Sequence, residues 1–267
     1  MQPARIAELL APFLGNAHDQ QLTPNDLQHI STYIDILQRW NARINLTAIR
    51  DPEQIVTRHF GESLFAARSL FPQRGHEATD QSSERGRAVL DGRVGGQSMT
   101  GALAPEGSES SVPSVSSALK KTLADVGSGA GFPGIPIKLW QPNLAVTLIE
   151  SNQKKATFLG EVVRVLTLTD VNILTARAES LTPAAFKAVT LRAVERFETI
   201  LPIAARLVAP EGRLALLIAS AQLSLAHSVL DQIGGFPARR RSTHPMPVSR
   251  SRTLFIAERS MQSASHG

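Results

Sequence analysis

The apolar residues of positions 1–72 recur at the three- and four-residue spacing of amphipathic helices. One helix is expected over residues 4–14. A second should begin after Thr23, a residue type that caps helix N-termini, with Pro24 in the first helical position. A third should begin after Asp51, which is again followed by proline. The apolar face of the second helix is expected to comprise Leu27, Ile30, Ile34, Leu37 and Ile44. The pattern therefore predicts a helical N-terminal subdomain.

Residues 121–260 show a different pattern, in which short apolar runs alternate with helical segments. This alternation is typical of βαβ units and predicts an α/β fold with a mainly parallel sheet. Strands are expected at residues 121–126, 145–149, 171–175, 188–191 and 213–218, and helices at 154–166 and 197–207. A last strand at 251–257 should lie antiparallel beside residues 239–243, which would complete a seven-stranded sheet.

The segment between these two parts, residues 73–120, has no sustained periodicity. It holds seven of the chain's 18 glycines and nine serines, and it has no aromatic residue. Such a composition buries too little apolar surface to offset the conformational entropy that ordering would cost. We interpret this segment as a disordered insert or linker, with a functional lid as the alternative. Residues 261–267 are expected to form a disordered tail.

A glycine-rich stretch follows the first expected strand. Gly127, Gly129 and Gly131 succeed one another at every second position, and Asp125 stands just before them. Glycines at this spacing let the backbone turn sharply and approach a bound ligand closely. A dinucleotide fingerprint would need a further glycine where Phe132 stands, so an NAD site is disfavoured. The D-x-G-x-G-x-G form resembles motif I of the class I methyltransferases that use S-adenosylmethionine (SAM), and the structural alternative is a simple turn.

Three further positions fall at the carboxyl ends of expected strands, where such sheets bind ligands. Glu150 ends the second strand, and its carboxylate is a candidate acceptor for ribose hydroxyls. Ala178 and Glu179 close the third strand, where they would border an adenine ring. Arg192 ends the fourth strand and faces the same edge. The alternatives are a solvated acid for Glu150 and a plain surface charge for Arg192.

Composition narrows the chemistry. The chain has 28 Lys and Arg against 23 acidic residues, a net charge of +5 that is compatible with an RNA partner. It has no cysteine, which excludes disulfides, thiolate metal sites and a cysteine nucleophile. No metal site is predicted. No apolar run reaches membrane-spanning length, and the N-terminus lacks the apolar region of a signal peptide, so a cytoplasmic protein without membrane contact is expected.

Two blocks of sequence resemble the RsmG/GidB family of SAM-dependent methyltransferases, which modify guanine N7 in 16S ribosomal RNA. The first runs from Leu37 to Arg50, with W-N-x-x-x-N-L-T-A-I at positions 40–49, and continues from Arg58 to Leu64. The second runs from Asp125 to Pro136 and includes G-F-P-G-I-P, and it continues through Glu150-Ser, Lys154-Lys and Arg192-Ala. The resemblance covers nearly the whole chain outside residues 73–120.

The resemblance implies a Rossmann-like methyltransferase domain with SAM as cofactor and the small ribosomal subunit, through its 16S rRNA, as partner. Taken together with the strand-end positions, it places the cofactor against Gly127, Gly129, Phe132, Glu150, Ala178, Glu179 and Arg192. A family signature in the N-terminal part comprises Asn41, Asn45, Thr47, Arg58 and His59, which would shape the mouth of the site or tie the helices to the sheet by hydrogen bonds. A monomer is expected.

Methylation of guanine N7 requires little acid–base chemistry, because N7 carries an in-plane lone pair and no proton. The protein has to align this atom with the methyl group, which is a positioning task. We therefore expect no catalytic base, and Arg192 is the candidate for positioning the target. Phosphate contacts are expected from dispersed cations, namely Lys154, Lys155, Arg239, Arg240, Arg241, Arg250 and Arg252.

Two other functions stay open from the sequence. The chain departs from the family pattern at Lys187, where an acid is usual, and at Ala219, where a basic residue is common. A catalytically weakened scaffold that binds RNA or SAM is therefore one alternative. The other is a SAM-dependent methyltransferase for a small molecule, against which the basic charge and the N-terminal signature count.

Overall fold

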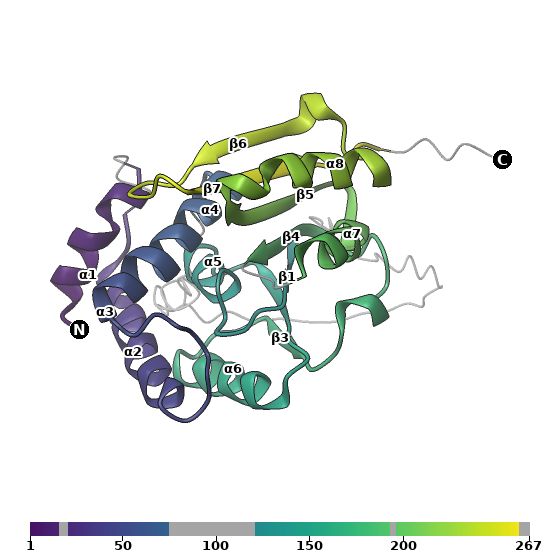
Figure 1. The fold of residues 1–267 in the computed structure, drawn as a ribbon. Helices are drawn as coiled ribbons and strands as arrows, with labels where there is room; N and C mark the ends of the chain where they lie inside the picture. Colours follow the sequence, from purple (N-terminus) through teal and green to yellow (C-terminus); the bar gives the residue numbers. More distant parts are fainter. Residues whose placement is uncertain (16–20, 75–120, 193–195, 262–267) are drawn as a thin grey trace, which may run out of the picture. The chain divides into compact units, whose positions relative to one another are not determined.

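A seven-stranded sheet with the order β3-β2-β1-β4-β5-β7-β6 organises the structure (Figure 1). The computed structural model describes residues 1–15, 21–74, 121–192 and 196–261. Neighbouring strands from β3 to β5 are parallel, whereas β7 is antiparallel to both β5 and β6. The strands are β1 Thr122–Val126, β2 Ala145–Ile149, β3 Val171–Leu174, β4 Phe186–Arg192, β5 Val208–Ala219, β6 Arg241–Pro245 and β7 Arg252–Glu258. The expected α/β fold of class I SAM methyltransferases is confirmed.

Helices cover both faces of this sheet. They are α1 Pro3–Leu10, α2 Pro24–Asn41, α3 Pro52–Gln54, α4 Glu62–Leu70, α5 Gly134–Trp140, α6 Gln153–Val165, α7 Phe197–Leu207 and α8 Leu223–Ile233. Alternate strand residues face opposite sides. Leu123 and Leu254 belong to the core shared with α1, α2 and α4–α6, while Ala124 and Phe255 belong to the core under α7 and α8.

The N-terminal helices share one core with the sheet. Tyr33 and Leu37 of α2 are fully buried in the same cluster as Leu123 and Leu148 of the central strands. Residues 1–76 and 120–267 accordingly group as one compact unit. The division of the chain into a helical subdomain, an insert and a methyltransferase domain stays a prediction, and residues 75–120 and 262–267, on which the disorder predictions fall, lie outside the described residues.

The second helix begins as predicted and ends earlier than predicted. The Thr23 side chain accepts a hydrogen bond from the backbone of Asp26, whose carboxylate accepts one from the backbone of Thr23 in return. The helix ends at Asn41, so the helical place expected for Ile44 is wrong. The Asn41 side chain explains the stop, because its oxygen accepts hydrogen bonds from the amides of Leu46 and Thr47 and folds the chain back.

Other boundaries also differ from the expectation. The third strand stops at Leu174, and residues 178–180 form a 3-10 turn beyond it rather than closing the strand. Strand β6 begins at Arg241 because residues 238–240 form another 3-10 turn. Helix α8 was not expected. Between α3 and α4 the chain forms a π-helical turn, Ile55–Gly61, a rare conformation that is often found at functional sites.

Gly134, at the start of α5, allows the glycine-rich loop to pack directly on the sheet. A Cβ atom there would lie 2.5 Å from Leu148 and 2.8 Å from the Asp125 carboxylate, which itself accepts a hydrogen bond from the Gly134 amide. We expect Gly134→Ala to lower the free energy of unfolding by about 1–3 kcal/mol, because neighbouring atoms must move. Urea denaturation measures this change.

Gly160 in α6 provides the matched control. Nothing lies within 4 Å of a Cβ atom at this position, so Gly160→Ala should raise the free energy of unfolding by about 0.5–1 kcal/mol through helix propensity alone. Equal effects of the two substitutions would contradict the close packing at Gly134.

Candidate active site

The loop after β1 places its backbone at the carboxyl end of the sheet. Gly127, Gly129 and Gly131 have φ values of 68°, 54° and 83°, the left-handed region that favours glycine. The amides of Gly127 and Ser128 donate to the carbonyl of Ile149 at 2.9 and 3.0 Å, so the loop curls over the end of β2. At Gly131 a Cβ atom would also collide with the Tyr33 hydroxyl. The three glycines are therefore required by backbone conformation, and the third also by space.

Glu150 holds this loop in place. Its carboxylate accepts hydrogen bonds from the Gly129 amide at 2.9 Å and from the Asn152 amide at 2.8 Å, one on each oxygen. The residue is 7% exposed, so the alternative of a solvated acid is excluded. Each carboxylate oxygen has a second lone pair, which leaves Glu150 able to accept the hydroxyl hydrogens of a ribose.

Two cavities at this end of the sheet have lining residues in common. The smaller, of about 200 Å³, is also lined by Ala178 and Glu179. The larger, of about 470 Å³, is also lined by Gly129, Phe132 and Arg192. Gly127 and Glu150 line both. Every residue that the sequence predicted for the cofactor site therefore lines one or both of these cavities.

Phe132 connects the loop to the N-terminal helices through ring contacts. It is 6% exposed and lies nearly parallel to Tyr33, with centroids 5.3 Å apart, and to His59, with centroids 4.7 Å apart. Phe60 meets it edge-on at 5.0 Å. The Tyr33 hydroxyl donates to the carbonyl of Ala130 in the loop, and burial raises the Tyr33 pKa well above its ordinary value. The loop is thus held from the helical side as well as from β2.

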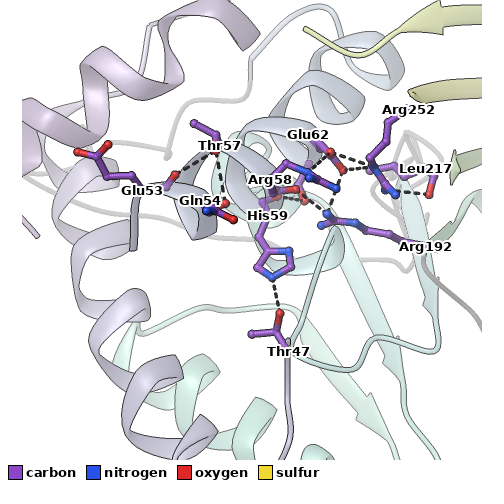
Figure 2. Close-up of polar contacts among 11 residues, drawn as sticks. Thr47, Glu53, Gln54, Thr57, Arg58, His59, Glu62, Arg192, Leu217 and Arg252 are labelled. Atoms are coloured by element: carbon purple, nitrogen blue, oxygen red, sulfur yellow. Dashed lines mark hydrogen bonds and ion pairs between the residues drawn. The ribbon is translucent and has the colours of Figure 1, made fainter. Parts of the chain in front are cut away.

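A buried carboxylate forms ion pairs with three arginines that line the larger cavity (Figure 2). Glu62, at the start of α4, is 1% exposed and pairs with Arg58 at 3.1 Å, Arg192 at 3.0 Å and Arg252 at 2.9 Å. The arginines come from the π-helical turn, the end of β4 and the start of β7. One carboxylate balances only one of the three cations, so the cluster keeps a positive surplus. Lys155 adds a further cation to the cavity wall.

The side chain of Arg192 is buried, so it is not a plain surface charge. Its side chain is 7% exposed, and one terminal nitrogen donates to the Arg58 carbonyl at 2.5 Å and to Glu62. Burial lowers the Arg192 pKa to about 10, so the guanidinium stays protonated at neutral pH. The other terminal nitrogen is buried without a hydrogen-bond partner.

His59 is held neutral in the wall of the same cavity. Its Nε2 lies 2.8 Å from the Thr47 hydroxyl, and its Nδ1 is buried without a partner. Burial, reinforced by the nearby positive charge of Arg192, lowers the His59 pKa to about 3. Within the family signature, Thr47, Arg58 and His59 therefore line the cavity, whereas Asn41 caps the end of α2.

Asp125, in β1, stabilises the glycine-rich loop through hydrogen bonds inside the core. It is 1% exposed and accepts hydrogen bonds from the Thr190 hydroxyl at 2.7 Å and from the Gly134 amide at 3.1 Å. Burial raises the pKa of this carboxyl to about 6. Asp125 thereby joins β1 to β4 and to the start of α5, and it does not line either cavity.

The cations expected to contact phosphate do not share one environment. Lys154, Arg239 and Arg250 are exposed. The expectation is wrong for Arg241, whose side chain is 4% exposed and donates to Asp231 and to the Phe236 carbonyl. Among the described residues no cluster of three or more potential metal ligands occurs, and no helix is long and apolar enough to cross a membrane.

Comparison with known proteins identifies the family to which the chain belongs. The sequence profile of rRNA small subunit methyltransferase G matches residues 26–80 and 109–227. The chain belongs to this family. It is 34% identical over 208 residues to the ribosomal RNA small subunit methyltransferase G of Xanthomonas campestris pv. campestris (strain B100), covering 78% of this chain and 76% of the relative. The corresponding protein of Roseiflexus sp. (strain RS-1) is 32% identical over 227 residues, covering 80% and 76%.

A solved structure of a putative SAM-dependent methyltransferase from Methanococcus maripaludis is also similar. It is 13% identical, with a TM-score of 0.45, and the match covers 54% of this chain and 80% of that one. Because this likeness is distant, the fold of the family member described here rests on its own strand order.

Two residues of the site were missed in the sequence. Glu62 lies inside the family block, and only its partner Arg58 is close in the sequence, because Arg192 and Arg252 stand 130 and 190 positions away. Tyr33 had a weak signal, since it shares the apolar face of α2 and a buried tyrosine needs a partner for its hydroxyl. The sequence did not show that this partner would be the glycine loop.

The lowered pKa of His59 predicts an acid-sensitive fold. The ordinary pKa is 6.5 and the folded value is about 3, so the unfolded chain binds the proton more readily. The resulting stability is complete above pH 6.5 and is lost as the pH falls toward 3. Between about pH 7 and pH 5 the loss from this residue should be about 2 kcal/mol.

Urea denaturation of wild type and His59→Gln across this pH range measures the contribution. Asp125, whose pKa is raised, acts in the opposite direction in the same range, so only the difference between the two proteins isolates His59. His244→Gln on β6 is the control and should keep the wild-type slope. An unchanged slope in His59→Gln would contradict a neutral buried imidazole.

Proposed function

We propose that the chain transfers the methyl group of SAM to N7 of a guanine in the 16S rRNA of the small ribosomal subunit. The coarser activity, SAM-dependent methylation of small-subunit rRNA, follows from membership of the family. The choice of N7 and of the guanine base is the proposal. The observation that supports it best is the pair of cavities that share Gly127 and Glu150, of which the larger is lined by cations and contains no suitable base.

The residues around the smaller cavity fit the adenosine part of the cofactor. Glu150 has free lone pairs for ribose hydroxyls, and the turn at Ala178 and Glu179 offers a backbone amide and a carboxylate to an adenine edge. The left-handed glycines bring the loop backbone close to the boundary between the cavities. When bound, SAM supplies a methyl group made electrophilic by its sulfonium. Gly127, Gly129 and Phe132 would orient that group toward the larger cavity.

The larger cavity suits a nucleophile that needs no deprotonation. His59, with a pKa of about 3, is too weak a base to remove a proton at neutral pH. The lone pairs of Glu150 that two backbone amides leave free are assigned to the ribose hydroxyls of the cofactor. Guanine N7 has a free lone pair and loses no proton when it attacks. The task left to the protein is alignment, which the rim of the cavity can provide.

The charge of the rim fits a nucleic-acid substrate. Arg58, Arg192 and Arg252 share the single carboxylate of Glu62, and Lys155 lines the same cavity. Such a surplus attracts phosphate groups. A neutral small molecule would not need it, which disfavours the small-molecule alternative. The expected cytoplasmic location and monomeric state are part of this proposal.

The two departures from the family pattern leave this cavity intact, which disfavours the weakened scaffold. Lys187 lies near the amino end of β4, where its amine donates to the Pro210 carbonyl. Ala219 pairs directly with Arg252 of the neighbouring strand, and the Arg252 guanidinium reaches Glu62 and the Leu217 carbonyl. Arg252 therefore supplies a cation beside the position where Ala219 lacks one.

Methyl transfer from labelled SAM to small subunits of cells that lack this modification tests the proposal. We expect label on N7 of one guanine in 16S rRNA. Arg192→Ala should lower kcat/KM by roughly a hundredfold, because a charged group that positions the target is lost. The fold should persist, since Glu62 keeps Arg58 and Arg252 as partners.

Arg5→Ala is the control for this loss, because Arg5 pairs with Glu8 and Glu53 on the surface of the N-terminal helices. Label on another atom or base would refute the N7 assignment. Binding of SAM without any transfer would favour the scaffold, and undiminished turnover of Arg192→Ala would remove its positioning role.

Binding of small subunits should depend strongly on salt, with a contribution from Lys155. Replacing Lys155 with Ala should weaken binding and reduce the slope of log affinity against log salt concentration by about one, since one phosphate contact is lost. Lys187 lies near the amino end of β4 and does not line the cavity, so Lys187→Ala should leave the slope unchanged. Filter binding at several salt concentrations measures both, and identical slopes for all three proteins would contradict the phosphate contact.

A further inference from the structure

Two residues that line the larger cavity each have a polar atom without a hydrogen-bond partner. In the part of the chain that the structure describes, three buried side-chain nitrogens have no hydrogen-bond partner: His59 Nδ1, Arg192 Nη1 and Arg74 Nε. His59 and Arg192 both line the larger cavity beside the glycine loop. Buried polar atoms are nearly always satisfied, and leaving one unpaired is costly. Two such atoms at one site point to a ligand that supplies the missing partner.

The contact with Thr47 is the basis on which the tautomer of His59 is assigned. The Thr47 oxygen accepts a hydrogen bond from the Ile49 amide at 3.1 Å, and the His59 Nε2 atom lies 2.8 Å from it. We assign the Thr47 hydroxyl hydrogen to Nε2, because the Thr47 oxygen already accepts the Ile49 amide. The proton of the neutral imidazole then lies on Nδ1, which makes Nδ1 a donor.

Arg192 Nη1 is a donor as well, because a guanidinium has no acceptor. The two orphan atoms therefore call for the same kind of partner, an acceptor oxygen. His59 lies against Phe132 of the loop with ring centroids 4.7 Å apart, so this acceptor would sit next to the place where the loop presents the cofactor.

We propose that His59 Nδ1 and Arg192 Nη1 donate hydrogen bonds to O6 of the target guanine and thereby select guanine over adenine. This inference rests on the proposed N7 methylation. O6 and N7 are neighbouring acceptors on the same edge of guanine, so a base that turns N7 toward the methyl group carries O6 alongside it. Adenine presents an amino group in place of O6, and two donors would face it without an acceptor.

The neutral state of His59 suits this role. Methylation of N7 places a positive charge on the purine ring, and a neutral donor does not oppose that charge. The low pKa of His59, about 3, keeps the imidazole neutral throughout the physiological range. The positive charge of Arg192 is offset in part by Glu62, 3.0 Å away.

Two substitutions at position 59 separate the proposed contact from a structural role. Asparagine carries its amide nitrogen near the place of Nδ1, whereas glutamine carries it near Nε2 and can keep only the contact with Thr47. We expect His59→Gln to lower kcat/KM on small subunits by tenfold to a hundredfold. His59→Asn should stay within about fivefold of wild type. The affinity for SAM, measured by calorimetry, should stay within about twofold of wild type in both variants.

Removal of O6 from the base gives the decisive comparison. Small subunits assembled from rRNA with 2-aminopurine in place of the target guanine keep N7 but lack O6. Wild type should lose tenfold to a hundredfold in kcat/KM on this substrate. His59→Gln should lose severalfold less than wild type, because only the Arg192 contact to O6 remains in this variant.

Equal losses of wild type and His59→Gln on the 2-aminopurine substrate would overturn the inference, as would equal activity of the Asn and Gln variants. A large fall in SAM affinity in His59→Gln would assign the donor to the cofactor instead of the base. These results leave the proposed function untouched as long as wild type methylates guanine N7, and label elsewhere in the wild-type reaction would refute both.

Discussion

The packing of Phe132 against the N-terminal helices is the contact on which the rest of the site depends. Phe132 belongs to the glycine loop, yet its ring lies against Tyr33 of α2 and His59 of the π-helical turn. The Tyr33 hydroxyl adds a hydrogen bond to the loop backbone. The helices therefore form one wall of the larger cavity rather than a separate module beside the sheet. The two sequence blocks that resemble the family, one in each part of the chain, therefore meet at this cavity.

Two buried carboxylates, Glu150 and Glu62, organise different parts of the site. Glu150 accepts two backbone amides and shapes the loop at the boundary of the cavities. Glu62 pairs with Arg58, Arg192 and Arg252 and holds cations from three separate elements at the rim. Each carboxylate is stabilised by the donors around it, which offsets the cost of burial. The first prepares a site for hydroxyl donors, and the second leaves a positive surface for an anionic substrate.

The sequence predicted those parts of the site that local rules determine. A strand followed by spaced glycines places the loop, and residues that follow parallel strands meet at one edge, so Glu150 and Arg192 were located correctly. The partners of Glu62 and Tyr33 were not predictable, because they depend on contacts between elements far apart in the chain. The predicted end of the second helix was wrong because the Asn41 side chain accepts a backbone amide and ends α2 there. The phosphate contact expected for Arg241 was wrong because its guanidinium donates to the nearby Phe236 carbonyl.

Hydrogen exchange of the backbone amides with and without SAM shows whether the cofactor binds beside Gly127 and Glu150, the residues that line both cavities. We expect added protection of the amides in residues 127–130, 150–151 and 178–179, which line one or both cavities. A third cavity, of about 410 Å³, shares Glu179 with the smaller one, so Ile203, Ala205 and Phe236 on its wall serve as the internal reference and should show no change. Protection confined to that third cavity, or calorimetric binding of SAM without protection at the loop, would contradict binding of the cofactor beside the glycine loop.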